Sequence, residues 1–174
     1  MVGGADPDRH GAVVYGALTG QRGAALRGYS DLIFEVKGQL PLDFDPSNSA
    51  SLLRMADRIK SLPVIPVAVE ACLRGGPAGT VRGIVVGALA YHGCEVSEAR
   101  VIKPGAWWQT ARLNIPGAGP VTCAAETIKR WVVGLDLEAV PGRVGSDARA
   151  MHQAGLMQAA CIARWFAIQR RERS

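Results

Sequence analysis

A chain of 174 residues can bury one full hydrophobic core and leaves little for a second domain. Twenty Lys and Arg against fifteen Asp and Glu give a formal net charge of +5, which favours a polyanionic partner. No run approaches the roughly 18 apolar residues of a membrane span, and four widely spaced cysteines without a C-x-x-C pair argue against a zinc site or a disulfide framework. We therefore expect one basic domain over residues 1–174, with 170–174 as a loose basic tail and no membrane partner.

The first sixteen residues predict a hairpin that presents a carboxylate. A short run of small and apolar residues ends at Asp6, Pro7 stops strand pairing, and Gly11 lets the chain return through residues 12–18. An acidic side chain on a rigid strand beside a tight turn suits a hard cation such as Mg²⁺, which prefers oxygen ligands. The alternative is an ordinary surface turn, because Asp-Pro-Asp is common turn chemistry.

The next segments predict a meander, a helix and a buried strand. Residues 24–36 contain a third strand, and the helix begins near residues 45–48 and ends at 60–61. The nearly continuous apolar run 64–69 is typical of a strand buried on both faces. Since this run ends in Glu70, it places a second carboxylate at a strand end.

The second half of the chain predicts three longer helices and one more strand. A helix over residues 80–92 carries small residues at Gly83, Gly87 and Ala90 that would let it lie close to the sheet, and a strand follows at 95–103. A turn at 104–108, a short helical segment after it, a helix over 122–133 and a final helix from 146 to about 169 complete the chain. The inward-facing residues expected on the final helix are Met151, Ala154, Cys161, Trp165 and Ile168. This order indicates an α/β domain with a mixed sheet of about five strands flanked by helices.

The motif Gly4-Ala5-Asp6-Pro7-Asp8 with Gly11-Ala12, followed by a buried strand ending in Glu70, resembles the RuvC-type Holliday junction resolvases of the ribonuclease H-like superfamily. The likeness is closer to their chloroplast branch, called monokaryotic chloroplast, which shares the Asp-Pro-Asp motif and a Pro-x-x-Trp turn similar to residues 104–107. The resemblance implies a ribonuclease H-like fold and a metal-dependent endonuclease that resolves four-way DNA junctions as a homodimer. It also implies Mg²⁺ or Mn²⁺ as cofactor, with two ions.

The compartment stays open at this point. No basic region followed by an apolar one is visible at the start, so no signal peptide is expected. The resemblance favours a chloroplast or another organelle, with a transit peptide absent from this chain, and a bacterial cytoplasm is the alternative.

The resemblance implies four acidic or histidine ligands, of which Asp6 matches the first and Glu70 the second. The last two should lie three residues apart on the C-terminal helix, where that spacing puts both side chains on one face. His152 matches the first of this pair, but Gly155 stands where the family has a carboxylate. Either Asp6, Glu70 and His152 form a three-ligand site, or Asp147 supplies the missing carboxylate, or the protein binds junctions without cutting them.

Each of these residues also has a purely structural interpretation. His152 could flank a buried helix face, and Asp147 could be an acidic residue favoured in a helix's first turn by the dipole. A third reading of the whole chain is an unrelated α/β protein in which the motif at Asp6 is merely a turn.

Nucleic-acid contacts are expected from basic and aromatic residues around the two carboxylates, because phosphates attract Lys and Arg, and unpaired bases stack on aromatic rings. The first choices flank the glycine-rich loop after Glu70. The candidates are Arg9, Arg74, Arg82, Lys103, Trp107, Trp108 and Arg112. The tryptophans could instead belong to the core. The basic cluster that the family has before the last helix is thin, with only Arg143 and Arg149.

Overall fold

The computed structural model describes residues 1–21, 32–71, 76–96, 106–109 and 117–172; the side chains of Gln21, Trp108, Gln109 and Glu172 lie outside the description. Five strands form one sheet: β1 (Val2–Asp6), β2 (Ala12–Gln21), β3 (Leu32–Pro41), β4 (Val67–Val69) and β5 (Val132–Val133). Their spatial order is β4-β1-β2-β3-β5. The first three strands form an antiparallel meander, whereas β4 runs parallel to β1 and β5 parallel to β3. The expected α/β mixed sheet is confirmed, and its topology is consistent with a ribonuclease H-like fold.

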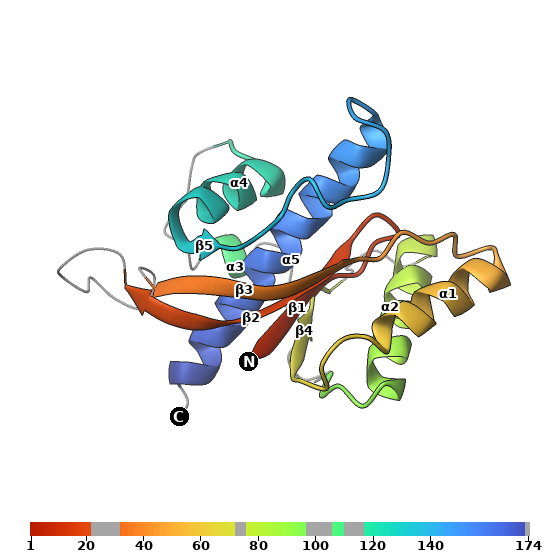
Figure 1. Cartoon of the computed structure of the whole chain (residues 1–174), viewed down its shortest axis with the longest axis horizontal. Helices are drawn as coiled ribbons and strands as arrows, with labels where there is room; N and C mark the ends of the chain where they lie inside the picture. Colours follow the sequence, from red (N-terminus) through yellow and green to blue (C-terminus); the bar gives the residue numbers. More distant parts are fainter. Residues whose placement is uncertain (22–31, 72–75, 97–105, 110–116, 173–174) are drawn as a thin grey trace.

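Helices cover both faces of this sheet (Figure 1). They are α1 (Ser49–Ile59), α2 (Pro77–Tyr91), α3 (Ala106–Gln109), α4 (Pro120–Trp131) and α5 (Asp147–Glu172). One core lies between the sheet and α1 and α2, with Met55, Ile59 and Leu89 among its buried residues. The other lies between the sheet and α3, α4 and α5, with Phe34 and Phe166 among its buried residues. None of the helices in the described ranges is long and apolar enough to cross a membrane.

Helix α5 packs unusually close to β1. A Cβ on Gly4 would overlap the backbone of Ala159 and Ala163, so only glycine allows this approach. Cys161 and Ile168 are buried as predicted, but Met151 is 46% exposed, because the first turns of α5 extend beyond the strand ends (Figure 1). The close packing fixes where the middle of α5 meets the turn between β1 and β2.

Three local predictions need correction. Gly83, Gly87 and Ala90 point away from the sheet, because the larger residues Val85 and Leu89 fill the buried side of α2. The expected helix 122–133 ends at Trp131, and the two β-branched residues that follow pair with β3 as β5. The buried run 64–69 contributes only Val67–Val69 to the sheet.

Two other expectations are tested only in part. Of the predicted strand 95–103, the described residues include Val96, which forms a parallel bridge with Val67 on the outer side of β4. Residues 97–103 lie outside the description, as does the expected strand segment 24–31. The predicted start of α1 is confirmed, because the side chain of Asn48 accepts a hydrogen bond from the N–H of Ser51 at 3.1 Å.

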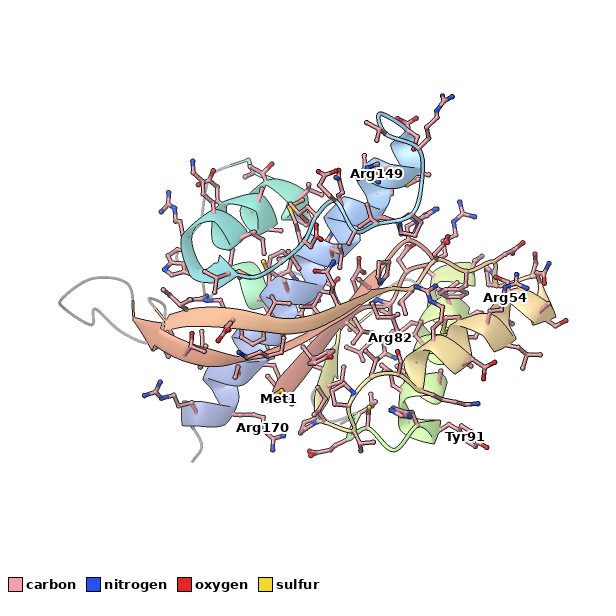
Figure 2. The ribbon with its side chains drawn as sticks, viewed as in Figure 1. Met1, Arg54, Arg82, Tyr91, Arg149 and Arg170 are labelled. Carbon is pink, nitrogen blue, oxygen red and sulfur yellow. The ribbon has the colours of Figure 1, made fainter. Side chains whose placement is uncertain are left out.

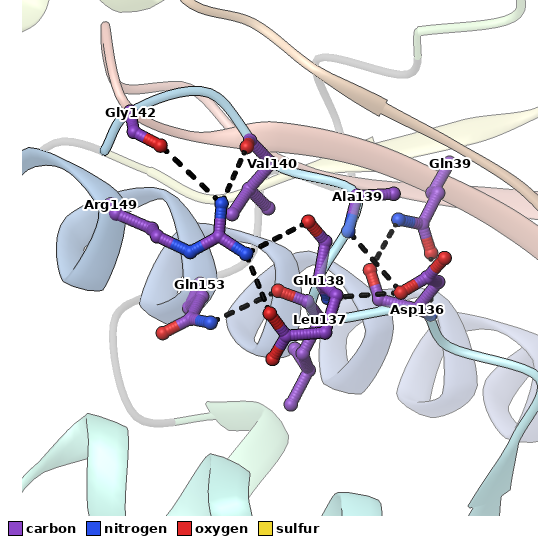
Figure 3. A network of polar contacts seen from close by, with 9 residues as sticks. All are labelled: Gln39, Asp136, Leu137, Glu138, Ala139, Val140, Gly142, Arg149 and Gln153. Atoms are coloured by element: carbon purple, nitrogen blue, oxygen red, sulfur yellow. Dashed lines mark hydrogen bonds and ion pairs between the residues drawn. The ribbon is translucent and has the colours of Figure 1, made fainter. Parts of the chain in front are cut away.

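The connector between β5 and α5 is held by a polar network (Figure 3). The guanidinium of Arg149 donates to the carbonyls of Glu138, Val140 and Gly142 and pairs with the Glu138 carboxylate at 2.6 Å. Gln39 of β3 exchanges two hydrogen bonds with the backbone of Asp136. The Arg149 guanidinium is therefore occupied by contacts within the connector. Of the two arginines in the expected basic cluster, Arg143 is the exposed one.

Candidate metal and nucleic-acid site

Asp6 and Glu70 lie side by side because their strands are parallel neighbours. Ala5 pairs with Val69, and the N–H of Glu70 donates to the carbonyl of Ala5 at 3.2 Å, so Asp6 at the end of β1 and Glu70 directly after β4 lie at the same edge of the sheet. Both carboxylates line one pocket of about 450 Å³, which the Pro7–Arg9 turn and the start of α2 also border. The structure thus brings together the two acidic residues that the sequence singled out.

Burial and the neighbouring carboxylates disfavour the ionised form of Asp6. Burial, then the charge of Glu70 and then that of Asp8, raise the pKa of Asp6 to about 8. Burial also raises the pKa of Glu70, while the indole N–H of Trp107, which donates to Glu70 Oε1 at 3.1 Å, opposes that rise. Two carboxylates that repel each other in a partly buried pocket favour either a proton or a cation between them.

The donor set fits one hard cation. Mg²⁺ typically takes one or two protein carboxylates and completes its shell with water and phosphate oxygens, which is the chemistry that Asp6 and Glu70 offer. Within the described ranges, no three His, Cys, Asp or Glu residues are grouped so that they could hold a metal ion. Ligands for the expected second ion are therefore not found in this part of the chain.

His152 does not join the two carboxylates. Its side chain is 2% exposed, with Nε2 lying 3.5 Å from Oδ1 of Asp43 and its ring packed edge-on against His10 at 5.0 Å between centroids. Burial lowers the pKa of His152, although the Asp43 carboxylate opposes this shift. The structure thus places His152 outside the carboxylate pocket, against Asp43 and against His10 of the β1–β2 turn.

Gly155 faces Asp6, but the turn occupies the space that a side chain would need. A Cβ at this position would lie 3.3 Å from Asp6 Oδ2, yet only 2.5 Å from the carbonyl oxygen of His10 and 2.8 Å from the Cα of Gly11. A hollow of about 270 Å³ beside it is lined by Asp6 and Asp8 among others. The backbone of His10 and Gly11 thus occupies the space that a carboxylate at residue 155 would need.

Asp147 does not substitute for that carboxylate. It lies in the first turn of α5, two turns before Gly155, which corresponds to about 12 Å along a helix. It is exposed and borders a different hollow, together with Glu138 and Arg149. Asp147 therefore lies outside the carboxylate pocket and is not placed to act as a ligand with Asp6 and Glu70.

The predicted nucleic-acid residues divide into three groups. Arg9 and Arg82 line the carboxylate pocket, and the Nε of Arg82 donates to the backbone carbonyl of Glu70 at 3.1 Å. Trp107 is 2% exposed and bonded to Glu70, so it positions the carboxylate instead of offering a base-stacking surface. Outside the described residues or side chains lie Arg74, Lys103, Trp108 and Arg112.

The site contains one further acidic residue of the Asp-Pro-Asp motif. Asp8 borders the hollows on both sides of Asp6 and accepts a hydrogen bond from the N–H of His10 at 3.0 Å. The second acidic residue of Asp-Pro-Asp was the available signal, but turn chemistry explained it equally well.

No protein-family model, curated protein or solved structure significantly matches this chain.

Proposed function

We propose that the protein is a metal-dependent endonuclease that hydrolyses phosphodiesters in branched DNA, with four-way junctions as its substrate. The observation that carries the proposal is the Asp6–Glu70 pair at adjacent ends of parallel strands, in a pocket that Arg9 and Arg82 also line. Carboxylates that bind a divalent cation, next to guanidinium groups that attract phosphate, are what phosphodiester hydrolysis requires.

Each residue of the pocket has a separate role. Asp6 and Glu70 hold Mg²⁺, Trp107 orients the Glu70 carboxylate, and Arg82 anchors the Glu70 backbone. Arg9, exposed on the turn, attracts the substrate phosphate to the rim. When bound, the ion neutralises charge on the phosphodiester oxygens and lowers the pKa of water.

A second candidate function is junction binding without cleavage. The contact of Gly155 with the backbone of His10 favours it, because the turn excludes the side chain that the resolvase pattern has there. A site with fewer ligands stabilises less of the charge of the phosphoryl transition state, so the rate of cutting falls while phosphate contacts remain.

We further propose a homodimer, since a four-way junction has two equivalent strands to cut. The exposed side of α2 is a suitable surface, because Gly83 and Gly87 leave space for a second helix to approach closely. Sedimentation equilibrium of the chain with and without junction DNA tests this assembly, and a monomer under both conditions contradicts it.

The deciding experiment is cleavage of a labelled four-way junction beside a linear duplex of the same sequence, with Mn²⁺ or with chelator. Asp6→Asn removes a proposed ligand, and Asp147→Asn is the matched control because that carboxylate lies outside the pocket. Metal-dependent nicks in the junction, lost only in Asp6→Asn, support the nuclease. Junction-selective binding without nicks supports the second candidate, and equal affinity for both DNAs contradicts both functions.

A further inference from the structure

We propose that a second hollow, next to the Asp6–Glu70 pocket, binds a backbone phosphate that neighbours the one held at the carboxylates. This arginine pocket, of about 520 Å³, is bordered by Arg9, Asp43, Asp45, Ser51, Arg54 and Arg58. The inference rests on the proposed function and adds to it the path of the DNA strand.

The arginine side chains of this pocket carry positive charge that can attract a phosphate. Arg58 donates to the carbonyls of Pro41 and Leu42, which are neutral, so its guanidinium charge is not cancelled. Neither guanidinium of Arg9 and Arg54 makes a hydrogen bond or an ion pair with any residue in the described ranges, and both residues are exposed. Three guanidinium groups thus face one hollow, and the charge of Arg9 acts on the Asp45 carboxylate at its border.

The two acidic residues of the hollow are already engaged. The Asp45 carboxylate accepts hydrogen bonds from the N–H of Ser47 at 2.9 Å and from its hydroxyl at 2.7 Å. Asp43 faces the ring of His152 at 3.5 Å. Two carboxylates against three guanidinium groups leave a net positive charge, which suits a phosphate.

The arginine pocket adjoins the carboxylate pocket at Arg9, which borders both. Their spacing is fixed, because the N–H of Phe44 donates to the carbonyl of Arg9 at 3.3 Å and the N–H of Leu42 to that of Gly11 at 2.9 Å. Figure 2 shows Arg82 and Arg54 on α2 and α1, which lie on the same side of the sheet. A strand whose reacting phosphate lies at the carboxylates therefore passes Arg9 and places a neighbouring phosphate between Arg9 and Arg54.

The test is junction binding in chelator, followed by fluorescence anisotropy over a range of salt concentrations. For Arg54→Gln we expect the slope of log K against the logarithm of the salt concentration to be less negative by about 0.9, the value for one lost phosphate contact. Arg54→Lys should keep nearly the original slope, because it retains the charge. Arg171→Gln is the matched control, since Arg171 is an exposed arginine at the far end of α5.

A neutral methylphosphonate, placed at one linkage at a time, identifies the phosphate concerned. One methylphosphonate near the branch point should weaken binding by the unaltered chain more than it weakens binding by Arg54→Gln, which keeps Arg9 at that phosphate. If Arg54→Gln keeps the original slope and the same methylphosphonate profile, the arginine pocket is refuted while junction binding stands. If the unaltered chain shows no salt-dependent DNA binding at all, the proposed function fails, and this inference fails with it.

Discussion

Gly155 and His10 are in such close contact that a Cβ on the glycine would lie 2.5 Å from the histidine's carbonyl oxygen. The Gly155 backbone lies in α5 and the His10 carbonyl in the β1–β2 turn, and neither can move alone. A side chain at residue 155 must therefore displace either α5 or the turn that carries Asp6. We expect Gly155→Ala to lower the free energy of unfolding by about 1–3 kcal/mol. Gly155→Asp should also fail to increase nuclease activity.

Urea unfolding of both variants checks this expectation, with Gly20→Ala as the control. Gly20 lies in β2, away from the proposed α2 surface, with open space at its Cβ, so alanine there should change the free energy of unfolding by less than about 1 kcal/mol. A Gly155→Asp variant that is as stable as the unaltered chain and cuts faster would show that the turn yields to a carboxylate.

The raised pKa of Asp6 predicts how stability depends on pH in the absence of metal. Its pKa is about 8 in the folded protein against 3.8 for an ordinary aspartate, so between these values the folded state keeps a proton that the unfolded state has lost. The free energy of unfolding should therefore decrease as the pH rises from about 4 to 8. Asp6→Asn should flatten this slope and be more stable than the unaltered chain at pH 8, where the folded wild-type carboxyl begins to ionise.

Unfolding in chelator at several pH values measures this dependence. Adding Mn²⁺ at pH 8 should stabilise the unaltered chain more than Asp6→Asn, because the cation binds the ionised carboxylates. Identical pH profiles of the two proteins would show that Asp6 ionises normally in the fold.

His152→Gln separates a ligand from a supporting residue. Because the ring is buried against Asp43 and His10, we expect a loss of about 1–3 kcal/mol in unfolding free energy and an unchanged affinity for Mn²⁺. Isothermal titration with Mn²⁺ compares it with Glu70→Gln, which should bind the ion much more weakly. An equal loss of affinity in both variants would return His152 to the ligand set.

Trp107→Phe tests the hydrogen bond to Glu70. Without the indole N–H, the pKa of Glu70 should rise further, so that Mn²⁺ affinity at pH 6 should fall about tenfold and recover at higher pH. The control is Trp131→Phe, because Trp131 lies at the end of α4 and outside the pocket. Its ring packs against Arg164, whose guanidinium lies 5.0 Å from the ring centroid. If both variants bind Mn²⁺ as the unaltered chain does, the indole has no part in the metal site.

The sequence indicated Asp6 and Glu70 one by one, because strand ends are visible as breaks in local patterns, whereas only the resemblance implied that they act together. Pro7 ends the first apolar run and Glu70 the fourth, and parallel pairing then brings the two ends together. Which residues of α5 face the pocket could not be predicted in the same way. Helical period puts His152 and Gly155 on one face, but only the packing of the turn decides that His152 meets Asp43 while Gly155 meets His10.

Other errors have the same origin in tertiary contacts. The small residues of α2 suggested close packing, yet Val85 and Leu89 bury more apolar surface and so determine which side faces the sheet. Val132 continues the helical pattern of α4, but pairing with Phe34 draws it into the sheet. The arginine pocket joins residues from the first turn, the β3–α1 loop and α1, a combination that no local pattern indicates.

The parallel pairing of β1 with β4 also determines when the protein acquires its chemistry during folding. The hairpin of β1 and β2 can form from neighbouring residues, but Asp6 meets Glu70 only after β3 and α1 have been made and β4 has docked beside β1. Such non-local pairings form late, because loop closure precedes the gain from contact. On the proposed function, affinity for a divalent cation therefore marks the docking of β4 beside β1, and a chain still emerging from the ribosome holds Asp6 without Glu70 beside it.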